Sequence, residues 1–117
     1  MTYHPDRRRG ERVRVAAVAA LETKGKFKPN DQGLGAVRDV SRFGIGLETG
    51  QPPLVGQRVL LRVAIDDDVH ELTCLATRVE RREGSNFYDV GLDWSSCTPE
   101  QLLFLGRIIQ LAVEHQL

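Results

Sequence analysis

Apolar and polar residues alternate along most of this chain with the period of two that is typical of β-strands. Residues 21–32 interrupt the pattern because they are polar and contain Gly25, Pro29 and an Asn-Asp pair, so we interpret them as a loop or a weak edge hairpin. Strands that follow one another without intervening helices pair antiparallel, and about six of them predict a small barrel or sandwich. The strand-like runs cover residues 12–20, 34–40, 45–49, 57–65, 69–81 and 87–94.

Near the C-terminus the period changes from that of a strand to that of a helix. Thr98 supplies a capping hydroxyl, Pro99 suits the first helical position, and Gln101 completes a capping box. We therefore expect one helix over residues 98–116 that closes one side or end of the sheet. Its apolar stripe is formed by Leu102, Leu105, Ile109, Ala112 and Val113.

The composition predicts one globular domain, which we expect in the cytoplasm. With 117 residues the chain allows a single core, and its 41% apolar and 27% charged residues argue against wholesale disorder. No apolar run approaches the roughly 18–20 residues of a membrane span. The first residues also lack the apolar segment of a signal peptide.

Motifs for catalysis or metal binding are missing from the sequence. Cys74 and Cys97 lack the CxxC or paired-His spacing of zinc sites, and no nucleophile motif stands near any of the three His residues. The acidic run Asp66–Asp68 lacks the Gly and the distal Glu of a calcium-binding EF-hand loop, so we interpret it as a solvated hairpin turn. The sequence therefore predicts no metal and no cofactor, and it argues against an enzyme.

Charge is neutral overall but unevenly distributed. Residues 6–14 (DRRRGERVR) hold five Arg against Asp6 and Glu11, a net charge of +3, which leaves −3 for the rest of the chain. Every cation in this window is Arg, whose planar donor fork suits phosphate or the edge of guanine. The cluster indicates anion binding, with nucleic acid as the first partner to consider, and a solvated basic tail is the alternative.

A second polar cluster lies in the segment Asp39–Gly46 (DVSRFGIG), between two strand-like runs. Asp39 and Ser41 can hydrogen-bond nearby backbone N–H groups, while Gly44 permits a tight turn or close approach of another group. We interpret Gly46 as structural. By itself the segment is explained as a local bend, but the Arg cluster would supply donors that complement its carboxylate.

The two clusters together resemble the motifs of the PilZ domain family. Residues 8–12 fit RxxxR and residues 39–44 fit [D/N]xSxxG, in the family's order and about thirty residues apart. The strand around residues 90–92 and the C-terminal helix also match that family's layout. The resemblance implies a mainly β fold, a six-stranded antiparallel β-barrel of the split-barrel type with a C-terminal helix. This single domain would cover residues 12–117, after a flexible Arg-rich leader at residues 1–11.

The resemblance also implies a ligand, the bacterial second messenger cyclic di-GMP, which has two guanines and two phosphates. Arg8 and Arg12 can offer donor forks to phosphate or to guanine O6 and N7, and the Asp39 carboxylate can accept from guanine N1 and N2. The residue before RxxxR is implied to influence whether one ligand or a stacked pair is bound, and here it is Arg7. The implied site is formed by Arg7, Arg8, Arg12, Asp39, Ser41, Gly44 and Gly91.

The function that follows is a bacterial receptor or adaptor. We expect the ligand to order the leader against the barrel and to change the surface seen by an unidentified partner protein. One alternative is a PilZ-fold interaction module that binds no ligand. Another is a small β-barrel that binds RNA or DNA, which would need an aromatic stacking platform, whereas we expect Trp94, Phe87 and Tyr88 in the core. The apolar helix could also pair with a second copy of the chain.

Overall fold

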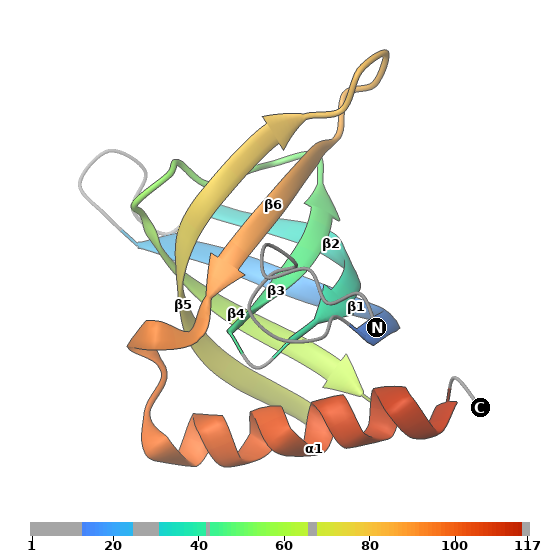
Figure 1. The fold of residues 1–117 in the computed structure, drawn as a ribbon. Helices are drawn as coiled ribbons and strands as arrows, with labels where there is room; N and C mark the ends of the chain where they lie inside the picture. Colours follow the sequence, from blue (N-terminus) through green and yellow to red (C-terminus); the bar gives the residue numbers. More distant parts are fainter. Residues whose placement is uncertain (1–12, 25–30, 42, 66–67, 116–117) are drawn as a thin grey trace, which may run out of the picture.

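Six antiparallel strands close into a barrel in the computed structural model, which describes residues 13–24, 31–41, 43–65 and 68–115 (Figure 1). The order around the barrel is β1-β2-β3-β6-β5-β4. The predicted six-stranded antiparallel barrel with a C-terminal helix is confirmed. The elements are β1 (Val13–Lys24), β2 (Asp31–Val40), β3 (Gly44–Thr49), β4 (Arg58–Ile65), β5 (Asp68–Arg81), β6 (Tyr88–Asp93), the 3-10 turn η1 (Trp94–Ser96) and the helix α1 (Pro99–His115).

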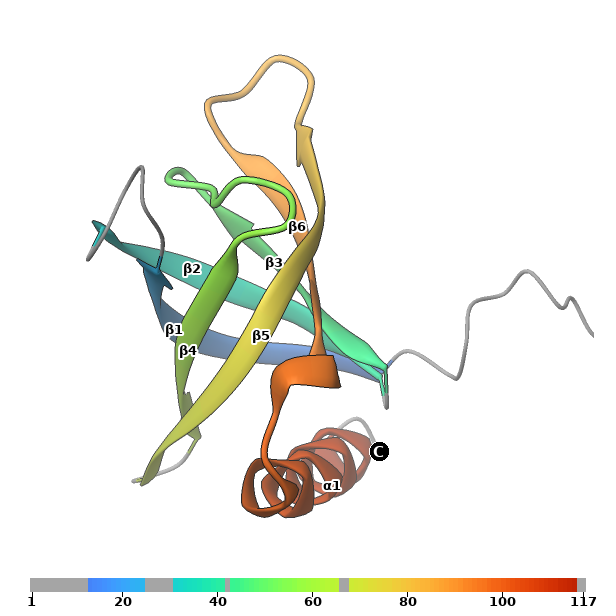
Figure 2. The same cartoon turned by 90° about the vertical axis from the view of Figure 1, so that its left-hand side faces the viewer.

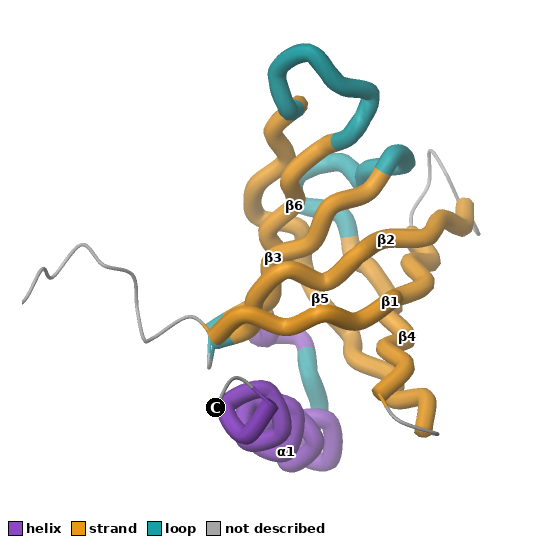
Figure 3. The backbone as a smooth tube through the Cα atoms, turned by 90° about the vertical axis from the view of Figure 1, so that its right-hand side faces the viewer, coloured by secondary structure: helices purple, strands orange, loops and turns teal. Residues whose placement is uncertain are grey.

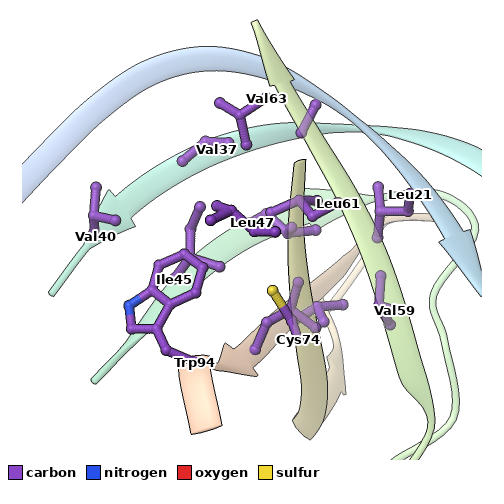
Figure 4. Packing of buried hydrophobic residues seen from close by; sticks show 14 of the residues in the cluster. Leu21, Val37, Val40, Ile45, Leu47, Val59, Leu61, Val63, Cys74 and Trp94 are labelled. Carbon is purple, nitrogen blue, oxygen red and sulfur yellow. The ribbon is translucent and has the colours of Figure 1, made fainter. Parts of the chain in front are cut away.

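The core fills the inside of the barrel, because alternation sends every second side chain of a strand inward (Figure 4). Trp94, which follows β6, is 3% exposed, as expected from the sequence. Cys74 and Cys97 are free thiols, and burial raises the pKa of both, so they stay protonated at neutral pH. The largest fully buried side chains are Leu21, Ile45, Leu47, Leu61, Leu72, Val40, Val59, Val63, Val90, Thr49 and Cys74.

Of the two interpretations of residues 21–32, a hairpin fits the structure better than a loop, because the end of β1 pairs antiparallel with the start of β2. The strand β1 continues to Lys24, and β2 already begins at Asp31. Leu21 and Thr23 face the core, whereas Glu22 between them faces outward and accepts a hydrogen bond from Arg62 of β4 at 3.2 Å. The alternation of a strand therefore continues through this polar stretch.

Phe87 was expected in the core, and the structure corrects this prediction, because its side chain is 50% exposed. It lies just before β6, in the β5–β6 hairpin that extends beyond the barrel in Figure 1. Its ring lies beside Gly50, the residue that follows β3, and not among the core side chains. Tyr88, one residue later, packs partly against the core.

The capping box of α1 forms as predicted and also fastens the helix to the barrel. The Thr98 N–H donates to Gln101 Oε1 at 3.0 Å, and the Gln101 N–H donates to Thr98 Oγ1 at 3.2 Å. Gln101 Oε1 also accepts from the N–H of Thr73 in β5 at 3.2 Å. The helix consequently lies across one end of the barrel, as Figure 2 shows.

The buried face of α1 differs in part from the predicted stripe. Leu105 is buried, and Phe104 stacks on His70 of β5 with ring centroids 3.4 Å apart. Leu102, which was expected to face inward, is 46% exposed, and Leu103 beside it is 79% exposed. The covered face of the helix therefore includes Phe104 as well as Leu105, and Leu102 is only partly covered. None of the helices in the described ranges is long and apolar enough to span a membrane.

Candidate binding site

Ser41 builds the turn between β2 and β3. Its buried hydroxyl accepts from the backbone N–H groups of Phe43 at 3.2 Å and Gly44 at 3.3 Å, and its own N–H donates to the Gly44 carbonyl at 2.8 Å. The Ser41 carbonyl accepts from Nε1 of Trp94 at 2.8 Å. Ser41 thus shapes the turn and ties it to the core, while its predicted contact with a ligand stays a prediction.

Gly44 is required by the packing of β3 against β6. A Cβ atom at this position would collide with the carbonyl oxygen of Leu92 in β6. The residue is buried, and the main effect of its missing side chain is that β3 and β6 can approach each other. A role of Gly44 in contacting a ligand stays a prediction.

Asp39 is placed by an irregularity in the pairing of β2 with β3. Val37 pairs with Leu47 and Asp39 pairs with Gly46, so β2 contains one more residue than β3 over this interval. A Cβ atom on Gly46 would lie only 2.8 Å from Asp39 Oδ1. The carboxylate therefore lies against Gly46, which we had interpreted as structural only.

Gly46 lies beside a second glycine on the neighbouring strand, because it pairs with Gly91 of β6. The neighbours of both glycines along their strands, among them Leu47 and Val90, are buried in the core, so the glycines lie on the outer side of the pleat. Figure 3 shows β2, β3 and β6 side by side. The two glycines form a strip of the outer face that has no side chains of its own, and Gly46 within it is buried.

Arg78 of β5 flanks the strip on the side opposite to Asp39. It pairs with Gly91, and its Nε atom lies 3.4 Å from the position of a Cβ on that glycine. Asp39, Gly46, Gly91 and Arg78 therefore form a continuous row across β2, β3, β6 and β5, which we call the glycine row. Asp39 and Gly91 are residues of the predicted site, whereas Gly46 was interpreted as structural and Arg78 was not among the candidates. A glycine inside a strand pattern is a signal of close approach that could have indicated Gly46.

The outer face beside the glycine row carries a compact group of ion pairs. Glu48 of β3 accepts from Arg38 of β2 at 2.6 Å and also pairs with Arg82. Arg82 in turn contacts Asp89 of β6 at 3.2 Å. Arg38 and Arg82 are thus already held by carboxylates. Among the described residues, no group of three or more His, Cys, Asp or Glu is arranged to hold a metal ion.

The predicted site residues Arg7, Arg8 and Arg12 lie outside the described residues. The backbone that follows them is described, and Val13 of β1 pairs with Val40 of β2. Arg14 pairs with Asp39 in the same ladder. The chain therefore enters the barrel directly after the RxxxR segment, at the strand position beside Asp39.

A family model shows the family of this chain, and solved structures show its fold. The family model described as the PilZ domain matches residues 6–111. Among solved structures, the PilZ domain of YcgR from Escherichia coli, determined with c-di-GMP, has a TM-score of 0.75 at 18% sequence identity, with 94% of each chain covered. A search of curated protein sequences finds no match.

Two further similar structures belong to larger proteins. The Bacillus subtilis inhibitor of motility MotI/DgrA has a TM-score of 0.67 at 16% identity, and MrkH of K. pneumonia in its apo state has 0.63 at 13%. The match covers 94% and 99% of this chain, respectively. It spans only about half of those two proteins, 51% and 55% of their chains.

Proposed function

Because the chain belongs to the PilZ domain family, we propose that it is a receptor for cyclic di-GMP. The observation that carries the proposal is the Asp39 carboxylate, held against Gly46 beside the position where the chain leaves the RxxxR segment. The similar PilZ domain of YcgR, which was solved with this ligand, supports the same assignment.

The two motifs supply complementary chemistry for a guanine nucleotide. The Asp39 carboxylate can accept hydrogen bonds from guanine N1 and N2, whereas Arg8 and Arg12 can donate to phosphate oxygens or to guanine O6 and N7. The missing side chains at Gly46 and Gly91 leave the Asp39 carboxylate room to lie close to the surface of the sheet, where a planar base can meet it. Ser41 holds the turn that presents the carboxylate.

In our proposal the ligand joins the Arg leader to the barrel. Arg8 and Arg12 close over the dinucleotide from one side, and Asp39 binds it from the other. Arg7 lies on a guanine face and favours a stacked pair of ligands over a single one. The new surface made by leader, ligand and barrel is then presented to a downstream protein, which gives the chain the role of an adaptor rather than of an enzyme.

Calorimetric titration with cyclic di-GMP tests the proposal. We expect saturable heat at tens of micromolar protein for the wild type and, for Arg8→Ala, an affinity roughly 10- to 150-fold lower, since charge-assisted hydrogen bonds contribute about 1.5–3 kcal/mol. Arg9→Ala removes the same charge outside the RxxxR register and serves as the control, with near wild-type affinity. Absence of heat for the wild type would refute the receptor role. Equal losses of affinity for Arg8→Ala and Arg9→Ala would show that the positive charge matters but the RxxxR register does not.

A further inference from the structure

We propose that Arg78 is a further ligand-binding residue, which together with Asp39 holds one guanine over the Gly46–Gly91 pair. The inference rests on the proposed function, since cyclic di-GMP is taken as the ligand. It adds to the site a residue of β5 that is far from both motifs in the sequence.

The pairing of β5 with β6 aims Arg78 at the glycine row. Ala76 pairs with Leu92 and Arg78 pairs with Gly91, so Thr77 is an extra residue in β5. The Thr77 hydroxyl donates to the Gly91 carbonyl at 3.2 Å and fixes this irregularity. Extra residues of this kind re-aim side chains and are common next to functional sites. A similar irregularity places Asp39 at the other end of the row.

The guanidinium of Arg78 is held in a way that leaves one of its edges over the row. Its Nη1 pairs with Glu80 Oε1 at 2.7 Å. Its Nε and Nη2 atoms, which form the other donor edge, lie 3.4 and 3.7 Å from the position of a Cβ on Gly91. Within the described part of the chain, Glu80 holds Arg78 through Nη1. The Nε–Nη2 edge can therefore donate two parallel hydrogen bonds to a ligand.

The surroundings favour guanine over phosphate as the group bound by this edge. Gly46 and Gly91 are a direct pair, so their Cβ positions would lie about 4.5–5.5 Å apart. The Asp39 carboxylate lies against the first position and the Nε–Nη2 edge of Arg78 against the second, so these two groups flank a gap that the edge of a single base can span. A phosphate placed there would face the negative charge of Asp39. Guanine instead presents donors N1 and N2 beside acceptors O6 and N7, which suits a carboxylate at one end and an Arg fork at the other.

Substitution of Arg78 tests the inference. In calorimetric titrations with cyclic di-GMP, we expect Arg78→Ala to lower the affinity roughly 10- to 150-fold, and Arg78→Lys to recover little of it, because an ammonium lacks the planar fork. Arg58→Ala is the matched control, since Arg58 is an exposed Arg on β4, away from the glycine row, and its loss should leave the affinity unchanged. Both Arg side chains are exposed, so thermal unfolding of both variants should match the wild type.

A cyclic di-GMP analogue with 7-deazaguanine bases, which lacks N7 but keeps the phosphates, identifies the group that Arg78 binds. We expect the wild type to bind the analogue more weakly than cyclic di-GMP, and we expect this difference between the two ligands to be smaller for Arg78→Ala. An Arg78→Ala loss of the same size for both ligands would overturn the guanine assignment. If the wild type binds cyclic di-GMP and Arg78→Ala binds it with the same affinity, only the role of Arg78 is overturned. If the wild type does not bind, the receptor function itself is refuted.

Discussion

Replacing Asp39 by Ala is expected to weaken cyclic di-GMP binding roughly 10- to 150-fold while the barrel stays folded. The carboxylate lies on the outer face against Gly46 and not in the core, so its removal leaves no cavity among the buried side chains. What is lost is the acceptor for the guanine N1 and N2 donors. The affinity is measured by calorimetric titration, and circular dichroism checks the fold.

Asp89→Ala provides the matched control for this loss of a carboxylate. Asp89 lies on β6, close to the same face, but its contact is the ion pair with Arg82 at 3.2 Å. We expect its removal to change the affinity less than about twofold, because exposed ion pairs contribute little. Wild-type affinity in the Asp39→Ala variant would remove this carboxylate from the site.

Trp94→Ala is expected to lower the free energy of unfolding by about 3–5 kcal/mol, the largest stability effect that we predict for a single substitution. The side chain is almost fully buried, and its indole N–H donates to the Ser41 carbonyl at 2.8 Å. The substitution therefore opens a cavity in the core and also releases the turn that presents Asp39. Urea unfolding followed by circular dichroism measures the change.

Trp94→Phe separates the two contributions. It keeps most of the apolar volume but leaves the Ser41 carbonyl without its donor, so we expect a loss of about 1–3 kcal/mol together with weaker ligand binding. Phe87→Ala is the control, because this aromatic side chain is half exposed and should cost less than about 1 kcal/mol. An unfolding free energy for Trp94→Ala within 1 kcal/mol of the wild type would contradict the role of Trp94 as an anchor.

The barrel could be predicted from the sequence because its strands alternate regularly and its helix begins with a capping box. The errors arose where local pattern and tertiary position disagree. Glu22 and its polar neighbours suggested a loop, although the strand continues and Glu22 forms an ion pair on the outside. Phe87 looked like a core residue, but it lies in the hairpin before β6 and its side chain is half exposed. The local sequence does not determine how far a residue lies from the core of the folded barrel.

Most of the candidate site was predicted from two contiguous motifs, and Gly91 was added from the layout that the family resemblance implies. Asp39 and Ser41 stand in one short turn, and their donor and acceptor chemistry could be derived from their types. Gly46 and Arg78 join the site through strand pairing and through an extra residue in β2 and in β5. Such register shifts are set by the packing of distant strands, so no local pattern around Arg78 pointed to the glycine row.

The most direct test of the account follows the backbone amide resonances of the glycines while cyclic di-GMP is added to the isotope-labelled chain. We predict that the resonances of Gly46 and Gly91 shift on saturation, because the base would lie over these two residues. Those of Gly56 and Gly84, which lie in turns with positive φ away from the glycine row, should keep their positions. Unchanged Gly46 and Gly91 resonances at saturating ligand would contradict binding of cyclic di-GMP at the glycine row.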